Sequence, residues 1–376
     1  MPAPAPSLSP VANDLRRGIV GLADVSAVKT HVRGEIPLVW LIGAIGLSLS
    51  AVVALMARFS MNVSVGHAGT LILAVIGFAA IVRLRLRGAQ PRRQQIWRDA
   101  SEYYGLFISI CVIGALAAYP MSAASSGFVD ATLQRIDDAA GFHWLAWYRF
   151  VAEHPAIQWP ERAAYQTIFL SPAILLGYFA WAGCRTQARL FLATFWLTAL
   201  VTLVLFAFLP AKGPLAHLWH GPLPYVPVSA LYQADLIPAL RNHAGSPIDL
   251  GALRGLVAAP SFHAASAVLY VFAAWPVKHL RWPFAMMNSA MLLATPVEGT
   301  HYLVDLIAGA AVACFVLVST ITVMAKMQRQ STKESKSTCW WTHNIVGLPQ
   351  RCKASLHLRM TGPGLHLSNV RRKGIK

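Results

Sequence analysis

Apolar stretches long enough to cross a membrane alternate with short polar segments along most of this chain. A helix needs about 20 apolar residues to span a bilayer. The pattern therefore predicts an all-α fold, a polytopic membrane helix bundle. Eight helices are expected, at residues 37–57, 68–82, 104–119, 167–183, 190–209, 261–277, 283–297 and 301–323.

The composition agrees with a membrane protein and not with a soluble one. Of the 376 residues, 56% are hydrophobic and only 12% are charged, whereas a soluble domain carries about 25% charged residues. The net charge of +17 lies mostly in short loops and in a basic tail. The positive-inside rule explains such a distribution, so no nucleic-acid partner is expected.

The basic loops also predict which segments share a side of the membrane. The loop Arg83–Arg98, the short loops at 185–189 and 278–281, and the tail all fall on one side, which should be cytoplasmic. The loops before the sixth and eighth helices then face the extracytoplasmic side of the cell membrane. Between the third and fourth helices, Leu133–Val151 is expected to form an amphipathic helix on the membrane surface.

Four segments follow from this topology. Residues 1–36 form a cytoplasmic N-terminal segment, which lacks the layout of a cleavable signal peptide. Residues 37–103 hold two N-terminal spans and the basic loop, and residues 104–324 form a six-helix core. Residues 325–376 are a basic cytoplasmic tail, which is expected to be disordered.

Two histidines mark the candidate chemistry. His263 closes the run Pro260-Ser261-Phe262-His263, and His301 precedes Asp305 by four residues. Ionisable side chains at membrane depth are costly and usually functional. On a helix His301 and Asp305 would share a face, so that the carboxylate orients the imidazole.

This set of residues suits phosphoryl transfer without a metal or any other cofactor. One imidazole can attack phosphorus and the other can protonate the leaving oxygen. A nearby cation, Lys212, and the helix start at Ser261 can hold the phosphate oxygens. Alternatives stay open: the histidines can bond across helices, His263, His301 and Asp305 can ligate zinc, and Lys212 can be a snorkelling anchor.

The two histidine motifs together resemble the type-2 phosphatidic acid phosphatase superfamily, over roughly Tyr104–Thr322. The resemblance covers the family's Pro-Ser-x-His and His-x-x-x-Asp motifs, and it implies a six-helix core, here with two additional N-terminal spans. It also implies that His301 is a nucleophile forming phosphohistidine, that Asp305 orients it, and that His263 is the general acid. Ser261 would bind phosphate.

Two arginines of the family pattern are absent. Trp219 stands where the Lys-x6-Arg-Pro motif that begins at Lys212 has its arginine, and Thr295 stands six residues before His301. With the run Leu209-Pro-Ala-Lys-Gly-Pro214, this departure is similar to the inositolphosphotransferase and inositol phosphorylceramide synthase-like branch. Arg254, seven residues before Ser261, is a candidate for the missing cation.

The sequence thus predicts an integral-membrane lipid phosphatase or phosphotransferase. Its partners would be a lipid phosphate, membrane lipids and, for a transferase, an alcohol acceptor. The alternatives are a transporter-like protein, in which polar residues line a path, and a non-catalytic protein that retains the fold.

Overall fold

A computed structural model describes residues 35–346 except 89–90, 230 and 244–246. The N-terminal segment up to residue 34 and the last thirty residues, 347–376, lie outside the described part. The chain divides into two units, Met1–Gln328 and Arg329–Lys376. All residues discussed as a candidate site belong to the first unit.

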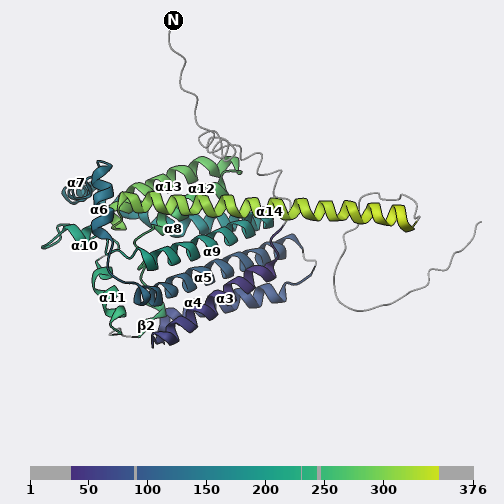
Figure 1. Ribbon diagram of the computed structural model, residues 1–376, viewed down its shortest axis with the longest axis horizontal. Helices are drawn as coiled ribbons and strands as arrows, with labels where there is room; N and C mark the ends of the chain where they lie inside the picture. Colours follow the sequence, from purple (N-terminus) through teal and green to yellow (C-terminus); the bar gives the residue numbers. More distant parts are fainter. Residues whose placement is uncertain (1–34, 89–90, 230, 244–246, 347–376) are drawn as a thin grey trace, which may run out of the picture. The chain divides into compact units, whose positions relative to one another are not determined.

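In the part of the chain that the structure describes, eight helices of 13 residues or more confirm the all-α bundle (Figure 1). In the described residues, six helices are long and apolar enough to cross a membrane: α3, α4, α5, α8, α9 and the Leu303–Gln328 part of α14. These helices mark a multi-pass membrane protein. The bounds of all eight are α3 Leu38–Arg58, α4 His67–Arg85, α5 Arg92–Ala124, α8 Pro155–Ala182, α9 Arg185–Phe208, α12 Phe262–Ala274, α13 Lys278–Glu298 and α14 Leu303–Val346.

Several helices are longer than their apolar stretches. Helix α5 begins at Arg92 instead of residue 104, and α8 begins at Pro155 instead of residue 167. Proline is well suited to the first helical position, because its missing N–H has no partner there. Both helices therefore extend beyond the bounds that hydropathy alone predicts.

The last helix extends into the basic segment that follows the apolar stretch. Helix α14 continues to Val346, past the expected end of the eighth span at residue 323. This segment has no Pro or Gly and holds several good helix formers, including Lys, Gln, Met and Glu. Local propensity explains why the helix does not stop where the hydropathy falls.

The non-spanning elements gather at one end of the bundle (Figure 1). They include a two-stranded parallel pair, in which Val63 pairs with Ile248. Their bounds are β1 Val63–Ser64, α6 Asp130–Ala139, α7 Trp144–Glu153, α10 Pro214–Leu218, α11 Tyr232–Arg241, β2 Ile248–Asp249 and the 3₁₀ turn η1 Leu250–Ala252.

The single amphipathic helix expected at Leu133–Val151 is two helices, α6 and α7. Gly141, with φ of +74°, lies at the break between them, a conformation that glycine adopts without steric cost. Trp144 and Tyr148 of α7 are fully buried and stack with ring centroids 5.4 Å apart. Trp144 Nε1 donates to the Pro296 carbonyl oxygen at 2.9 Å. One face of α7 therefore packs on the protein.

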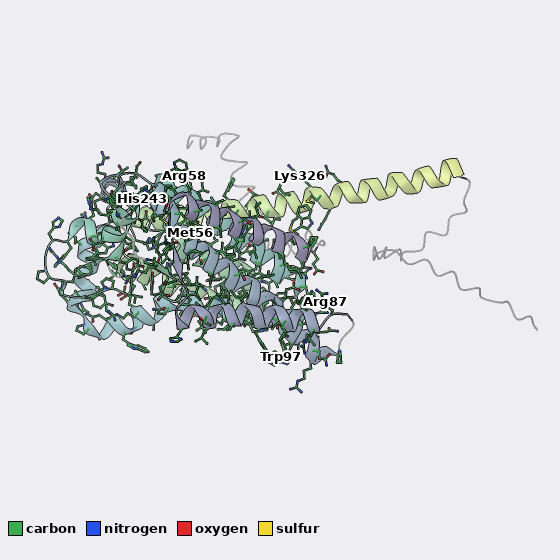
Figure 2. All side chains as sticks on the ribbon, turned by 90° about the horizontal axis from the view of Figure 1, so that it is seen from below. Met56, Arg58, Arg87, Trp97, His243 and Lys326 are labelled. Carbon is green, nitrogen blue, oxygen red and sulfur yellow. The ribbon has the colours of Figure 1, made fainter. Side chains whose placement is uncertain are left out.

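The opposite end of the bundle is held by ion pairs. The Glu102 carboxylate of α5 forms ion pairs with Arg189, whose Nε lies 2.7 Å from Oε1, and with Arg83, whose Nε lies 2.8 Å from Oε2. Arg185 Nε lies 2.9 Å from Oδ2 of Asp99. Figure 2 shows Arg87, Trp97 and Lys326 toward this end, and Arg58 and His243 toward the other. The arginine-rich loop after α4 and the base of the tail thus share one end, as the charge pattern predicts.

Candidate active site

The first histidine is positioned by the start of α12. Ser261 caps this helix, and its Oγ accepts the N–H of Ala264 at 3.4 Å. The backbone N–H of Ser261 donates to the carbonyl oxygen of Asp305 at 3.0 Å. Ser261 is fully buried, so the residue expected to bind phosphate fixes the start of α12 against α14. His263 follows in the first turn.

The second histidine lies between α13 and α14, and the expectation that it shares a helix face with Asp305 is wrong. Helix α14 begins only at Leu303, and Thr300 has φ of +51°. The N–H of His301 donates to the Pro296 carbonyl oxygen at 3.1 Å. His301 is therefore held by the last turn of α13, while Asp305 lies in the first turn of α14.

His301 and Asp305 nevertheless lie next to each other. His301 Nδ1 is 3.8 Å from Asp305 Oδ2, which is longer than a hydrogen bond. Neither His301 Nδ1 nor Asp305 Oδ1 has a hydrogen-bond partner, and both are buried. In active sites, contacts between a histidine and its carboxylate are often long without substrate and tighten in the complex. The separation allows Asp305 to stabilise a positive charge on His301.

The two histidine rings lie close together and are tilted relative to each other. Their centroids are 6.1 Å apart, with an interplanar angle of 59°. The His263 ring also stacks on Tyr165 of α8, at a centroid distance of 4.3 Å and an angle of 18°. Tyr165 was not identified from the sequence, because no local pattern shows that α8 packs against the start of α12. The stacking restricts how His263 can rotate.

Both histidines line one cavity of about 610 Å³. Most of its wall is apolar and comes from α5, α8 and α9, including Phe107, Ile110, Phe169 and Leu203. The polar part of the wall includes His263, His301, Arg254, Ser229 and Gln233. A large apolar chamber with a few convergent polar groups is the usual form of a small-molecule site. This one suits a ligand with a polar head and an apolar chain.

The two candidate cations differ in position. Arg254 lines the cavity, and its guanidinium carbon lies 5.0 Å from the Tyr232 ring centroid. Lys212 is not among the residues lining the cavity. Its ammonium nitrogen lies 5.6 Å from the Phe128 ring centroid. The structure therefore brings Arg254, and not Lys212, to the same chamber as the histidines.

The positions of the absent arginines are occupied by packing residues. Trp219 meets Tyr148 edge to face at 5.5 Å, and its Nε1 donates to the Pro222 carbonyl oxygen. Thr295 is fully buried, and its hydroxyl donates to the Met291 carbonyl oxygen at 2.7 Å. Neither position supplies a charge to the site.

Two buried carboxylates of α6 organise the surroundings of the site. Asp130 accepts the backbone N–H groups of Lys212 and Gly213, each at 3.0 Å, and the hydroxyl of Tyr302 at 3.1 Å. A Cβ at Gly213, where φ is +90°, would lie 2.6 Å from the Thr300 carbonyl oxygen. The Lys212-Gly213 loop and the His301 segment are thus tied to each other through Asp130.

The second carboxylate, Asp137, caps helix α14. It accepts the N–H groups of Leu303 at 2.7 Å and Val304 at 2.9 Å. Burial raises the pKa of Asp137 above its usual value, although the two N–H groups act in the opposite direction. Asp130 and Asp137 are seven residues apart on one helix face. That spacing indicates in the sequence that both carboxylates share a helix face, but the sequence does not show which residues this face contacts.

His and Asp side chains, which make up the candidate site, are also common metal ligands. Within the described part of the chain, His, Cys, Asp and Glu side chains do not gather in groups of three or more that could hold a metal ion.

These features define the class of the protein as a multi-pass helical membrane protein with a paired-histidine site in a mainly apolar chamber. The chain belongs to the PAP2 superfamily, whose sequence model matches residues 131–319, about half of the chain. Membership points to phosphatase-type chemistry. No curated protein and no solved structure matches the chain.

Proposed function

We propose that the protein is an integral-membrane enzyme that cleaves or transfers the phosphate group of a lipid through a phosphohistidine on His301. One observation carries this proposal. The rings of His263 and His301 approach to 6.1 Å at the wall of a mainly apolar cavity that also contains Arg254. A lipid phosphate has the apolar chain and the anionic head that this cavity suits.

The first step forms the phosphohistidine. Nδ1 of His301 faces Asp305, so Nε2 is the nitrogen that attacks phosphorus. The bond from phosphorus to the lipid oxygen breaks, and protonated His263 donates its proton to that oxygen. Asp305 stabilises the positive charge that develops on His301. Arg254 neutralises charge on the phosphate oxygens.

The second step releases the phosphate group. The oxygen of water or of an alcohol attacks phosphorus, and the bond to His301 Nε2 breaks. His263, now neutral, accepts the proton of the attacking hydroxyl group. Water gives hydrolysis, and an alcohol gives transfer.

The residues around the two histidines differ in the roles proposed for them. Ser261 holds α12 against α14, and its phosphate contact would require its hydroxyl proton, since its N–H is already bonded to Asp305. Lys212 lies outside the cavity wall, so the proposal relies on Arg254 as the cation. The absence of arginine at positions 219 and 295 favours the inositolphosphotransferase-like branch, in which an alcohol acceptor resolves the intermediate.

The decisive experiment is a substrate panel with purified protein in vesicles. Phosphatidate, undecaprenyl pyrophosphate, phosphatidylglycerol phosphate and phosphatidylinositol are offered as donors, each with and without inositol. We expect turnover of at least one donor by the wild type and a loss of at least about 10³-fold in His301→Ala. His220→Ala, an exposed histidine of the outer loop, is the matched control. Unchanged activity in His301→Ala would refute the mechanism.

A non-catalytic protein that retains the fold makes a different prediction. It would turn over none of the donors, and His301→Ala would behave as the wild type in every assay.

A further inference from the structure

The cavity wall contains a buried amide with an unused hydrogen-bond acceptor. Gln233 of α11 is only 3% exposed, and it lines the cavity that holds both histidines. Its Oε1 has no hydrogen-bond partner. Buried polar atoms are nearly always bonded, so an unpaired one at a binding cavity indicates a ligand group.

The surroundings determine which end of this amide is free. Gln233 Nε2 lies 3.4 Å from the Gly255 carbonyl oxygen and 3.4 Å from Ser229 Oγ. A carbonyl oxygen only accepts hydrogen bonds, so the NH₂ end must face Gly255. The oxygen end is therefore the one without a partner.

The helix that carries Gln233 is fixed relative to His301. The N–H of Ser229, just before α11, donates to the Glu298 carbonyl oxygen at 2.9 Å. The Glu298 carboxylate accepts the Val228 N–H at 2.9 Å. Glu298 is the last residue of α13, three residues before His301. Gln233 and His301 thus belong to one connected framework.

An amide oxygen selects the chemistry of its ligand. The phosphate oxygens of the donor are acceptors and negatively charged, so they are repelled by Gln233 Oε1 and attracted by Arg254. A hydroxyl group, in contrast, can donate to Oε1. The wall therefore offers one place for phosphate and another for a hydroxyl donor.

We propose that Gln233 binds the hydroxyl-bearing acceptor whose oxygen attacks the phosphohistidine, and so decides between transfer and hydrolysis. This inference rests on the proposed function. A second hydroxyl of the acceptor donates to Gln233 Oε1 while the attacking hydroxyl loses its proton to His263. A phosphorus–oxygen bond forms and the phosphorus–nitrogen bond to His301 breaks. Ser229 adds a second polar group beside Gln233 for a polyol.

The test measures the ratio of transfer to hydrolysis for full-length protein in vesicles. The donor is the one that the substrate panel selects, and the acceptor is myo-inositol or glycerol. Phosphorylated alcohol and free inorganic phosphate are quantified together. In Gln233→Leu we expect the ratio to fall about tenfold, with hydrolysis changed by less than about threefold, because one hydrogen bond to the acceptor is lost.

Two variants make the result specific. Gln233→Glu keeps an acceptor oxygen and is expected to keep the ratio near the wild-type value, even if turnover falls. Asp235→Asn, an exposed position on the same helix, is the control and is expected to change nothing. An unchanged ratio in Gln233→Leu, or equal losses of transfer and hydrolysis, would overturn the proposal.

Wild-type protein that hydrolyses the donor but transfers nothing to either alcohol would also overturn it. Each of these results leaves the role of His301 intact, since failure of the proposed function is instead shown by active His301→Ala.

Discussion

Ser261 lies directly against Gly309, so that the backbone at the start of α12 closely approaches the first turns of α14. A Cβ at Gly309 would overlap the carbonyl oxygen of Ser261. One turn earlier on α14, the carbonyl of Asp305 accepts the Ser261 N–H at 3.0 Å. This close approach sets the distance between His263, on one helix, and the His301–Asp305 pair beside the other.

Substituting Gly309 by Ala should therefore damage catalysis more than folding. Relieving the overlap requires the two helices to separate, which should cost about 1–3 kcal/mol of stability. A displacement of about 1 Å at the site can lower kcat about 100-fold. Turnover and thermal unfolding of the purified variant measure both effects.

Gly46→Ala is the control for that substitution, because nothing lies within 4 Å of a Cβ at Gly46. Gly309→Ala with wild-type kcat would show that the Ser261 contact does not set the geometry of the site.

The Asp305 carboxylate should act on the rate and not on substrate binding. The Asp305 Oδ2 accepts the Tyr302 N–H at 3.2 Å. In Asp305→Asn the charge that stabilises His301 is lost, while the amide oxygen can still accept this N–H. We expect kcat to fall about 10²–10⁴-fold, with KM and the thermal midpoint close to the wild type. A kcat within threefold of the wild type, about 0.65 kcal/mol or less in barrier height, would contradict the orienting role of Asp305.

Arg254 is expected to be the main phosphate-binding cation. Its side chain is exposed, so Arg254→Ala should be expressed and folded normally, yet lose turnover by at least about 100-fold. Arg254→Lys should recover part of the activity, because the charge remains but the bidentate geometry does not. Steady-state kinetics on the selected donor test this prediction.

Two further basic residues serve as comparisons for Arg254. Arg135→Ala, on the exposed face of α6, should be silent, and Lys212→Ala should have a smaller effect than Arg254→Ala. Normal activity in Arg254→Ala would remove Arg254 from the site.

The raised pKa of Asp137 leads us to expect that the free energy of unfolding depends on pH. Burial raises the pKa of Asp137 in the folded state. At pH values between its unfolded pKa, about 3.9, and its higher folded pKa, the Asp137 carboxyl is therefore protonated more often in the folded state than in the unfolded state. The contribution of Asp137 to the free energy of unfolding should therefore decrease as the pH rises through that window. Thermal midpoints of the wild type and Asp137→Asn, compared from pH 4 to pH 7, isolate this contribution.

The expected sign is that the wild type gains stability relative to Asp137→Asn as the pH is lowered. A difference that does not vary with pH, or that varies in the opposite direction, would show that the folded pKa of Asp137 is not raised.

The proposed orientation can be tested by chemical labelling. In a background without the five native cysteines, His220→Cys should react with a membrane-impermeant maleimide on intact cells. Arg93→Cys should react only after permeabilisation. The reverse pattern would place the site on the cytoplasmic side without affecting the proposed chemistry.

The sequence by itself indicated the spans and the candidate site residues. Spans follow from apolar length, a local property of the chain, whereas their sidedness, expected from the basic loops, stays a prediction. His263, His301 and Asp305 were identifiable because ionisable residues are unusual at the ends of apolar helices. Ser261 was correctly placed at a helix start, since a serine before an apolar run is a common N-cap.

Only the tertiary structure decided how these residues are arranged. In the structure Arg254 lines the cavity and Lys212 does not, and Tyr165 stacks on His263. Asp130 and Asp137 hold the loops around His301. It also brought Gln233 to the same cavity. Each of these contacts joins residues far apart in sequence, and such contacts depend on how helices pack, whereas hydropathy and propensity report only on neighbours along the chain.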